Sequence, residues 1–266
     1  MSVAPIALDG AAVLLTGGAN GLGATTARLL AEQGAQLVIA DVDDEAGRAV
    51  ADSVGGSFVH CDVADPAQSV AAVAATVRRY GGLDIALLNA GLALGSRLGE
   101  DFDLDAYRLA MGVNLDGVVF GINAALPALK ARRGGSIVVT ASLAGLAATP
   151  TDPVYCANKH AVVGLVRALG PVLIRDGVSI NAVCPGFADT RIVDGIRQYI
   201  ADAEIPLLEP IEVARTVRSI LADDQVGRAW FVQPGRAAEP FAFRNVPGPR
   251  GPSGEPVGRV PGVPPT

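Results

Sequence analysis

Short apolar runs alternate with longer segments of helical pattern along most of this chain of 266 residues. Most of the runs are continuously apolar, which is typical of strands buried on both faces of a sheet. Alternation of such strands with helices predicts a parallel sheet with helices on both faces, a doubly wound α/β domain. The expected strands are Ala12–Thr16, Gln36–Ala40, Ser57–His60, Ile85–Leu88, Ser136–Thr140, Ser179–Val183 and Ala229–Val232.

The composition predicts one domain followed by a tail. Half of the residues are hydrophobic, which is enough for one large core, and one domain is the usual outcome at this length. Half of the 18 prolines lie in residues 234–266, together with many glycines. Such a composition cannot build a core. We expect a folded domain over residues 1–245 and a Pro/Gly-rich tail over residues 246–266, which packs across a subunit boundary or near a pocket mouth.

Charge and hydropathy exclude several classes of partner. The net charge of −6 offers no basic stripe for a nucleic acid. No run of 18 apolar residues could span a membrane, and Met1–Asp9 lacks the pattern of a signal peptide. Cys61, Cys156 and Cys184 are widely spaced, without metal-binding spacing, and are expected to be free, buried packing residues. We expect a cytoplasmic protein without a metal site.

A glycine-rich turn lies between the first expected strand and the first expected helix. Its glycines let the backbone approach a pyrophosphate, whose negative charge is favoured by the N–H groups at the helix start. The alternative is a tight turn without a ligand. The residues expected to contact a dinucleotide cofactor here are Gly17, Asn20, Gly21, Leu22 and Gly23.

Further cofactor contacts are expected where the next strands end, because ligands of open α/β sheets bind at the carboxyl ends of the strands. A carboxylate at Asp41 can accept hydrogen bonds from the adenosine ribose and would repel a 2′-phosphate, so NAD is preferred over NADP. Asp62 could reach the adenine amino group. The expected contacts are Asp41, Val42, Asp62, Val63, Asn89, Ala90 and Gly91.

Tyr155 and Lys159 stand four residues apart on a helix whose expected start is Asp152-Pro153. Residues at this spacing share one helix face, so the ammonium should favour the phenolate and lower the pKa of Tyr155 from about 10 towards neutrality. Gly170-Pro171 falls inside the same helix and predicts a kink or an early break. Such a phenol could exchange a proton with an alcohol or carbonyl oxygen, with Ser142 as a neighbour.

With these residues placed, the chain resembles the short-chain dehydrogenase/reductase family from about Gly10 to Phe231. Thr16–Gly23 fits its TGxxxGxG turn, and residues 88–91 fit its NNAG motif except that Leu88 replaces the first Asn. The residues that fit its catalytic tetrad are Asn114, Ser142, Tyr155 and Lys159. The residues that fit its nicotinamide-contacting segment are Pro185, Gly186 and Thr190.

The resemblance implies a Rossmann fold of seven parallel strands and a homodimer or homotetramer built on the helices after the fourth and fifth strands. It implies that Tyr155 is the general acid/base and that Lys159 lowers its pKa and binds the nicotinamide ribose. It further implies that Ser142 orients the substrate oxygen, and that Asn114 bends its helix and holds a water in a proton relay.

Apolar segments are expected to form the substrate wall, which suits a hydrophobic secondary alcohol or its ketone. They are Gly91–Leu98, Leu143–Thr149 and the stretch after Gly186. The specific alcohol and the direction of reaction stay open. Two rivals stay open as well: a protein that senses NAD(H) without catalysis, and an epimerase or dehydratase acting on nucleotide sugars.

Overall fold

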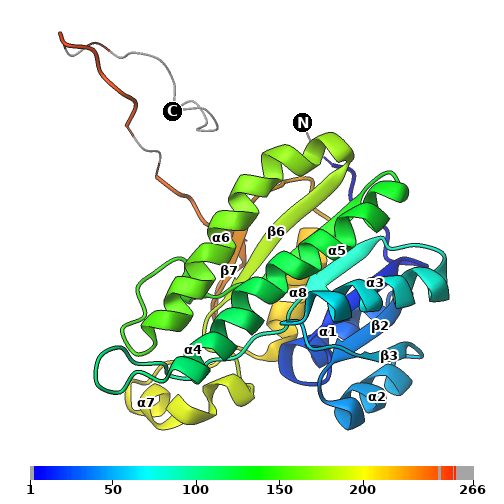
Figure 1. The fold of residues 1–266 in the computed structure, drawn as a ribbon, viewed down its shortest axis with the longest axis horizontal. Coiled ribbons are helices and arrows are strands. Elements are labelled where there is room, and N and C mark those ends of the chain that lie inside the picture. Colours follow the sequence, from blue (N-terminus) through cyan, green and yellow to red (C-terminus); the bar gives the residue numbers. More distant parts are fainter. Residues whose placement is uncertain (1–2, 245–246, 254, 256–266) are drawn as a thin grey trace.

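A sheet of eight strands forms the centre of the protein and separates two layers of helices (Figure 1). The computed structural model describes residues 3–244, 247–253 and 255. The strands are β1 (Ala12–Thr16), β2 (Gln36–Asp41), β3 (Ser57–His60), β4 (Ile85–Leu88), β5 (Gly135–Thr140), β6 (Val178–Pro185), β7 (Ala229–Val232) and β8 (Glu239–Pro240). Every strand expected from the sequence is present, with ends that agree to within two residues. The predicted doubly wound α/β domain is confirmed.

Helices cover both faces of the sheet. The α-helices are α1 (Gly21–Ala31), α2 (Asp44–Ser53), α3 (Pro66–Tyr80), α4 (Leu104–Met111), α5 (Gly117–Ala131), α6 (Pro153–Leu173), α7 (Arg197–Asp202) and α8 (Pro210–Leu221). Four short helices accompany them: η1 (Gly112–Asp116), η2 (Leu143–Gly145), η3 (Ile174–Asp176) and η4 (Arg191–Ile196). Apolar residues of α3, α5 and α6 form one core cluster with the sheet, and those of α1, α2 and α8 form the other.

The order of the strands positions the functional site. The sheet runs β3-β2-β1-β4-β5-β6-β7-β8, so the chain moves outward from β1 to β3 and then returns to β4 on the other side of β1. The loops that leave β1 and β4 diverge at this reversal and open a crevice beyond the carboxyl ends of the strands.

The eighth strand corrects the expectation of seven parallel strands. β8 pairs with the outer edge of β7 and is antiparallel, with Phe231 opposite Glu239. The chain can return there because Gly235 adopts a left-handed conformation after β7. Phe241 and Phe243 then stack edge to face, and the guanidinium of Arg167 lies 3.7 Å from the centroid of the Phe243 ring. This segment covers an otherwise unpaired sheet edge.

Helix α6 does not break at Pro171. It continues to Leu173 and then tightens into η3, which ends at the left-handed Gly177. Gly170 is needed for another reason: a Cβ there would lie 2.6 Å from the Cα of Gly227. The two backbones therefore touch where α6 crosses the approach to β7.

The predicted boundary at residues 245 and 246 and most of the predicted tail lie outside the described residues. The division into a domain over 1–245 and a tail over 246–266 stays a prediction.

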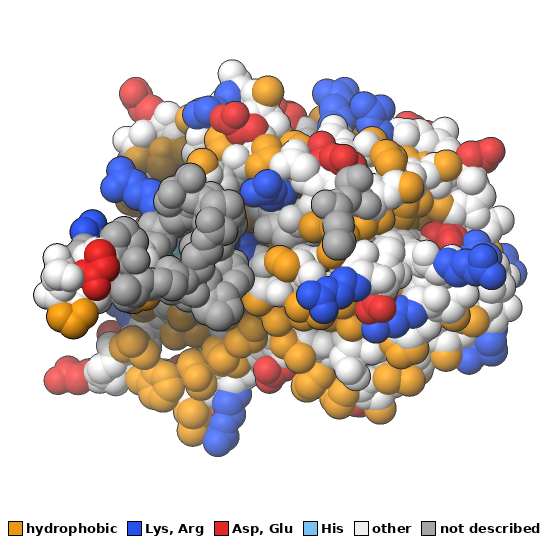
Figure 2. Space-filling model, turned by 90° about the horizontal axis from the view of Figure 1, so that it is seen from above, with side chains coloured by type: hydrophobic (Ala, Val, Ile, Leu, Met, Phe, Trp, Pro, Cys, Tyr) orange, Lys and Arg blue, Asp and Glu red, His pale blue; other side chains and the backbone are white. Residues whose placement is uncertain are grey.

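One stretch, Leu104–Ala131, is long and apolar enough by length and composition to cross a membrane. It comprises α4, η1 and α5, and one face of α5 is buried against the sheet through Val118, Ile122, Ala125 and Leu129. A core helix of a globular domain passes the same test of length and composition. The space-filling view shows one face of the molecule on which Lys and Arg side chains are interspersed with Asp and Glu (Figure 2).

Candidate active site

The glycine turn joins β1 to α1 at the base of a cavity of about 650 Å³. Gly17 has a left-handed φ of 65°, and a Cβ there would lie 2.6 Å from the Cα of Ala90. At Gly23 a Cβ would lie 2.0 Å from the carbonyl oxygen of Gly17. The turn can therefore close this tightly only with glycine at both positions.

The N-terminus of α1 is left without a side-chain cap. Its N-cap residue, Asn20, makes no side-chain hydrogen bond to the first turn. By contrast, α2, α3 and α6 are capped by the aspartates at positions 43, 65 and 152, which accept hydrogen bonds from backbone N–H groups. The uncapped N–H groups and the helix dipole favour an anion at the start of α1, beside the cavity.

Asp41 lies at the end of β2, where it lines the cavity and supports the glycine turn. One carboxylate oxygen accepts a hydrogen bond from the N–H of Ala19 at 3.0 Å, and the other accepts one from the N–H of Asp43 at 3.1 Å. Each carboxylate oxygen can accept a further hydrogen bond. Asp41 can therefore hold the turn and still receive ribose hydroxyls.

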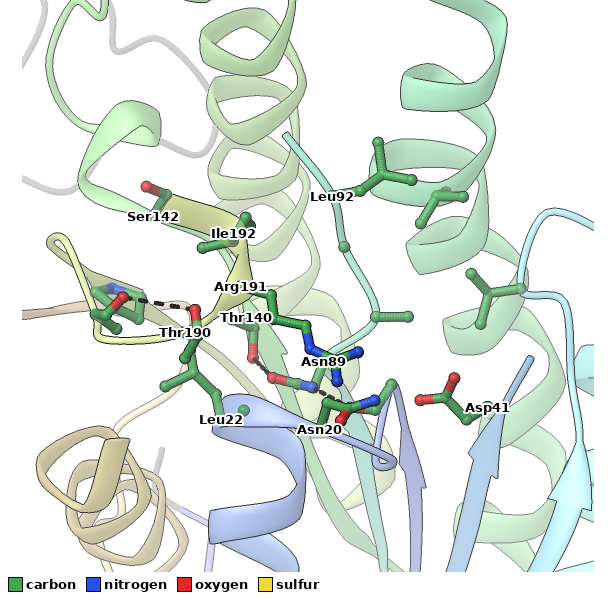
Figure 3. Close-up of a pocket in the computed structure, with 18 of the residues that line it drawn as sticks. Asn20, Leu22, Asp41, Asn89, Leu92, Thr140, Ser142, Thr190, Arg191 and Ile192 are labelled. Carbon is green, nitrogen blue, oxygen red and sulfur yellow. Dashed lines mark hydrogen bonds between the residues drawn. The ribbon is translucent and has the colours of Figure 1, made fainter. Parts of the chain in front are cut away.

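Asn89 connects the ends of three strands. Its side-chain N–H₂ donates to the carbonyl of Gly17 at 2.8 Å, and its side-chain oxygen accepts from the hydroxyl of Thr140 at 3.0 Å (Figure 3). Its backbone N–H donates to the Thr16 hydroxyl. Asn89 thus contributes to the cavity mainly by fixing the glycine turn.

Ser142 lies at the opposite end of the cavity from Asp41 (Figure 3), and Tyr155 and Lys159, which also line the cavity, lie beside it. Ser142 follows β5, while Tyr155 and Lys159 lie on the first turns of α6. The Lys159 ammonium is 5.5 Å from the centroid of the Tyr155 ring and donates to the carbonyl of Thr140 at 2.9 Å. A phenol, a hydroxyl and an ammonium therefore share one site.

Asn114 does not line the cavity. It is fully buried in the π-helical turn η1, between α4 and α5. Its side chain accepts from the N–H of Leu92 and donates to the carbonyl of Leu92, both at 2.9 Å. Asn114 thus lies in a π-turn, and its side chain anchors the loop after β4.

The pKa of Tyr155 corrects the expectation from helix spacing. Burial raises the pKa of Tyr155 to about 12, although a hydrogen bond with the Ser142 side chain favours the phenolate. Burial also lowers the pKa of Lys159 to about 8. In the protein alone, desolvation of the phenol therefore outweighs the hydrogen bond with Ser142.

Replacing Lys159 with Met should raise the stability at neutral pH. Lys159 is 2% exposed, and its pKa falls from 10.5 to about 8 on folding. The cost of the buried charge is complete below pH 8 and disappears as the pH rises from 8 to 10.5. We expect a gain of about 2 kcal/mol at pH 7, after allowing for the lost hydrogen bond to Thr140.

Thermal unfolding at pH 7 and pH 10.5 measures this effect. The gain should be lost at the higher pH. Lys130→Met is the control, since Lys130 is 48% exposed and paired with Asp176. A Lys159→Met protein that is less stable than the wild type at pH 7 would show that the ammonium is not destabilising.

Most of the predicted cofactor and catalytic residues line the cavity. The exceptions are Gly23, which packs against Gly17, and Asn114, which hydrogen-bonds to the backbone of Leu92. The cavity is also lined by residues for which the sequence predicted no role in the site: Cys61, Leu109, Val113, Thr140 and Ala141. Leu109 lies on α4 and Val113 lies in the π-turn η1, for which the sequence pattern carries no signal. Cys61 and Cys184 are buried as expected, but Cys156 is only partly buried.

The cavity fits a dinucleotide. The glycine turn leaves room for a pyrophosphate beside the uncapped start of α1, and Asp41 stands where an adenosine ribose would lie. Lys159 and Tyr155 line the same cavity and offer an ammonium and a hydroxyl to a polar group of such a ligand.

Comparison with known proteins identifies the family to which the chain belongs. A family model described as Enoyl-(Acyl carrier protein) reductase matches residues 17–228. The chain is 38% identical over 222 residues to Short-chain dehydrogenase reductase ATA1 of Arabidopsis thaliana, covering 83% of this chain and 80% of the relative. It is 36% identical over 220 residues to a 3-alpha-(or 20-beta)-hydroxysteroid dehydrogenase of Mycobacterium bovis, covering 82% and 84%. It is 35% identical over 223 residues to a cyclohexanol dehydrogenase of an Acinetobacter species, covering 79% and 87%. The chain therefore belongs to the short-chain dehydrogenase/reductase family.

Proposed function

We propose that this protein is an NAD-dependent oxidoreductase that interconverts a hydrophobic secondary alcohol and its ketone, with Tyr155 as general acid/base. Family membership and the names of the relatives support the general activity, which is that of an oxidoreductase acting on CH–OH groups of small molecules with a nicotinamide cofactor. The observation that carries the proposal is the convergence of Ser142, Tyr155 and Lys159 in one cavity with the glycine turn.

Each residue of the site has a distinct task. The Tyr155 hydroxyl exchanges a proton with the substrate oxygen, and Ser142 donates a hydrogen bond that orients and polarises that oxygen. Lys159 binds the nicotinamide ribose and favours the phenolate electrostatically. The cofactor supplies hydride transfer, and the protein supplies position and electric field.

Asn114 acts through the backbone of Leu92. Its two hydrogen bonds fix the loop that follows Gly91. A Cβ on Gly91 would lie 3.1 Å from the Asn114 side-chain oxygen and 3.4 Å from the Lys159 nitrogen, so the three groups are close neighbours. The proton relay through a water beside Lys159 is part of the proposal.

The substrate is proposed to be apolar. Aliphatic side chains line part of the cavity; they are Leu92, Leu109, Val113 and Ile192. Such a wall favours a hydrophobic ring or chain over a charged substrate. The relatives named for hydroxysteroids and cyclohexanol are in keeping with a cyclic secondary alcohol.

The NAD preference is proposed from the charge of Asp41. A 2′-phosphate beside this carboxylate would be repelled, whereas ribose hydroxyls can donate to it. Titration with NADH and NADPH, followed by nicotinamide fluorescence, should give at least about tenfold tighter binding of NADH.

An Asp41→Asn variant tests the cause. It removes the charge and keeps one acceptor for the N–H groups of Ala19 and Asp43. We expect the ratio of the two affinities to fall towards one. An unchanged ratio would show that Asp41 does not determine the preference for NADH over NADPH.

A non-catalytic NAD(H)-sensing protein is the alternative. It would bind NADH equally well, so only turnover separates the two. The retention of both Tyr155 and Lys159 in the cavity favours the enzyme.

We further propose a cytoplasmic homo-oligomer with no nucleic-acid or membrane partner. Exposed apolar side chains on α5 and α6, Val119 at 40% and Val172 at 55%, support contacts between copies through these helices. The mass in solution distinguishes a monomer, a dimer and a tetramer.

A further inference from the structure

We propose that Arg191 is a positioning residue for the pyrophosphate of the cofactor, which it binds from the side opposite the start of α1. This rests on the proposed function, because it requires that the cavity holds a nicotinamide dinucleotide. Arg191 begins η4, in the lid segment (residues 189–203) that follows β6.

The lid segment lies directly against the glycine turn. A Cβ on Gly21 would lie 3.1 Å from the methyl carbon of Thr190, so the glycine turn packs closely against the Thr190 side chain at this point. Arg191 and Ile192 follow Thr190 and both line the cavity. Ile192 lies near Ser142, whereas the Arg191 side chain extends over Asn89 towards Asn20 (Figure 3). Neighbouring lid residues therefore serve the two ends of the cavity.

The charge of Arg191 is available because its acidic neighbours are already paired. Asp189 binds the guanidinium of Arg197 at 2.7 Å, and Asp194 binds the same guanidinium at 2.8 Å. No ion pair of Arg191 is present within residues 3–244, 247–253 and 255. Arg197 thus binds the two carboxylates that flank Arg191, those of Asp189 and Asp194, and leaves the Arg191 guanidinium without an ion pair among the described residues.

The ligand expected for this guanidinium is a phosphate group. A guanidinium binds phosphate oxygens in a bidentate manner, and such charge-assisted hydrogen bonds are among the stronger polar contacts. The uncapped start of α1 supplies a partial positive charge on the other side of the turn. A pyrophosphate between them would meet positive potential from both sides, and binding would hold the lid segment closed.

The test compares NADH with adenosine, which lacks the phosphates. NADH affinity is measured by fluorescence and adenosine affinity by competition, for the wild type, Arg191→Met and Arg191→Lys. Arg175→Met controls for net charge, since Arg175 is exposed and lies in η3, at the far end of α6 from Tyr155.

In Arg191→Met, NADH should bind about tenfold more weakly, with adenosine unchanged and a shallower dependence of NADH affinity on salt. Arg191→Lys should recover part of the affinity, and Arg175→Met should match the wild type. Unchanged NADH affinity in Arg191→Met overturns the inference alone. An equal loss for adenosine also overturns it, because it indicates a loosened site rather than a lost phosphate contact. A wild-type protein that binds neither NADH nor NADPH overturns the proposed function as well.

Discussion

A Tyr155→Phe variant should lose at least about 10³-fold in kcat while its affinity for NADH changes little. The phenol oxygen is the only atom removed, and it is the atom proposed to exchange a proton with the substrate. The ring keeps its packing on α6, and Lys159 keeps its hydrogen bond to Thr140. The measurement is kcat for a cyclic secondary alcohol with NAD, together with the Kd for NADH.

The matched control is Tyr199→Phe. Tyr199 lies on α7, is 55% exposed and does not line the cavity, so the same chemical change there should leave kcat unaltered. Turnover by Tyr155→Phe at the wild-type rate would remove Tyr155 from the reaction. A large loss of NADH affinity in the same variant would mean that the hydroxyl serves binding rather than proton transfer.

The second large effect is expected at Gly23. A Cβ there would lie 2.0 Å from the carbonyl oxygen of Gly17 and 2.8 Å from the side-chain nitrogen of Asn89. These two atoms are themselves joined by a hydrogen bond of 2.8 Å, so the added methyl group must break it or open the turn.

Gly23→Ala should therefore lower the stability by about 2–3 kcal/mol, from overpacking and the lost bond, which lowers Tm by about 5–10 °C. NADH binding should weaken at least about 100-fold, since the turn that receives the pyrophosphate is displaced. Gly195→Ala is the control: a Cβ at Gly195 meets no atom within 4 Å. Near-normal NADH binding by Gly23→Ala would show that the turn adapts and is not needed in its present form.

Much of the fold could be predicted from the sequence because its signals are local. The strands are buried on both faces and are therefore continuously apolar, and their predicted ends agree with the structure to within two residues. Asp65 and Asp152 cap α3 and α6 as expected, because an aspartate before a proline satisfies the first N–H groups of a helix. The spacing of Tyr155 and Lys159 predicted that the two side chains share one site, and both line the cavity.

Other features depend on contacts between distant segments, and only the tertiary structure decided them. The return of β8 to the edge of β7 and the π-turn at Asn114 depend on packing that no local pattern encodes. The pKa of Tyr155 depends on burial by the whole surrounding wall, so a neighbour on the same helix could not predict it. The sequence by itself determined the strands, the glycine turn and the identities of the reactive groups, since these follow from local chemistry. Folding determined their electrostatic state, because it arises from burial by segments that meet only in the folded chain.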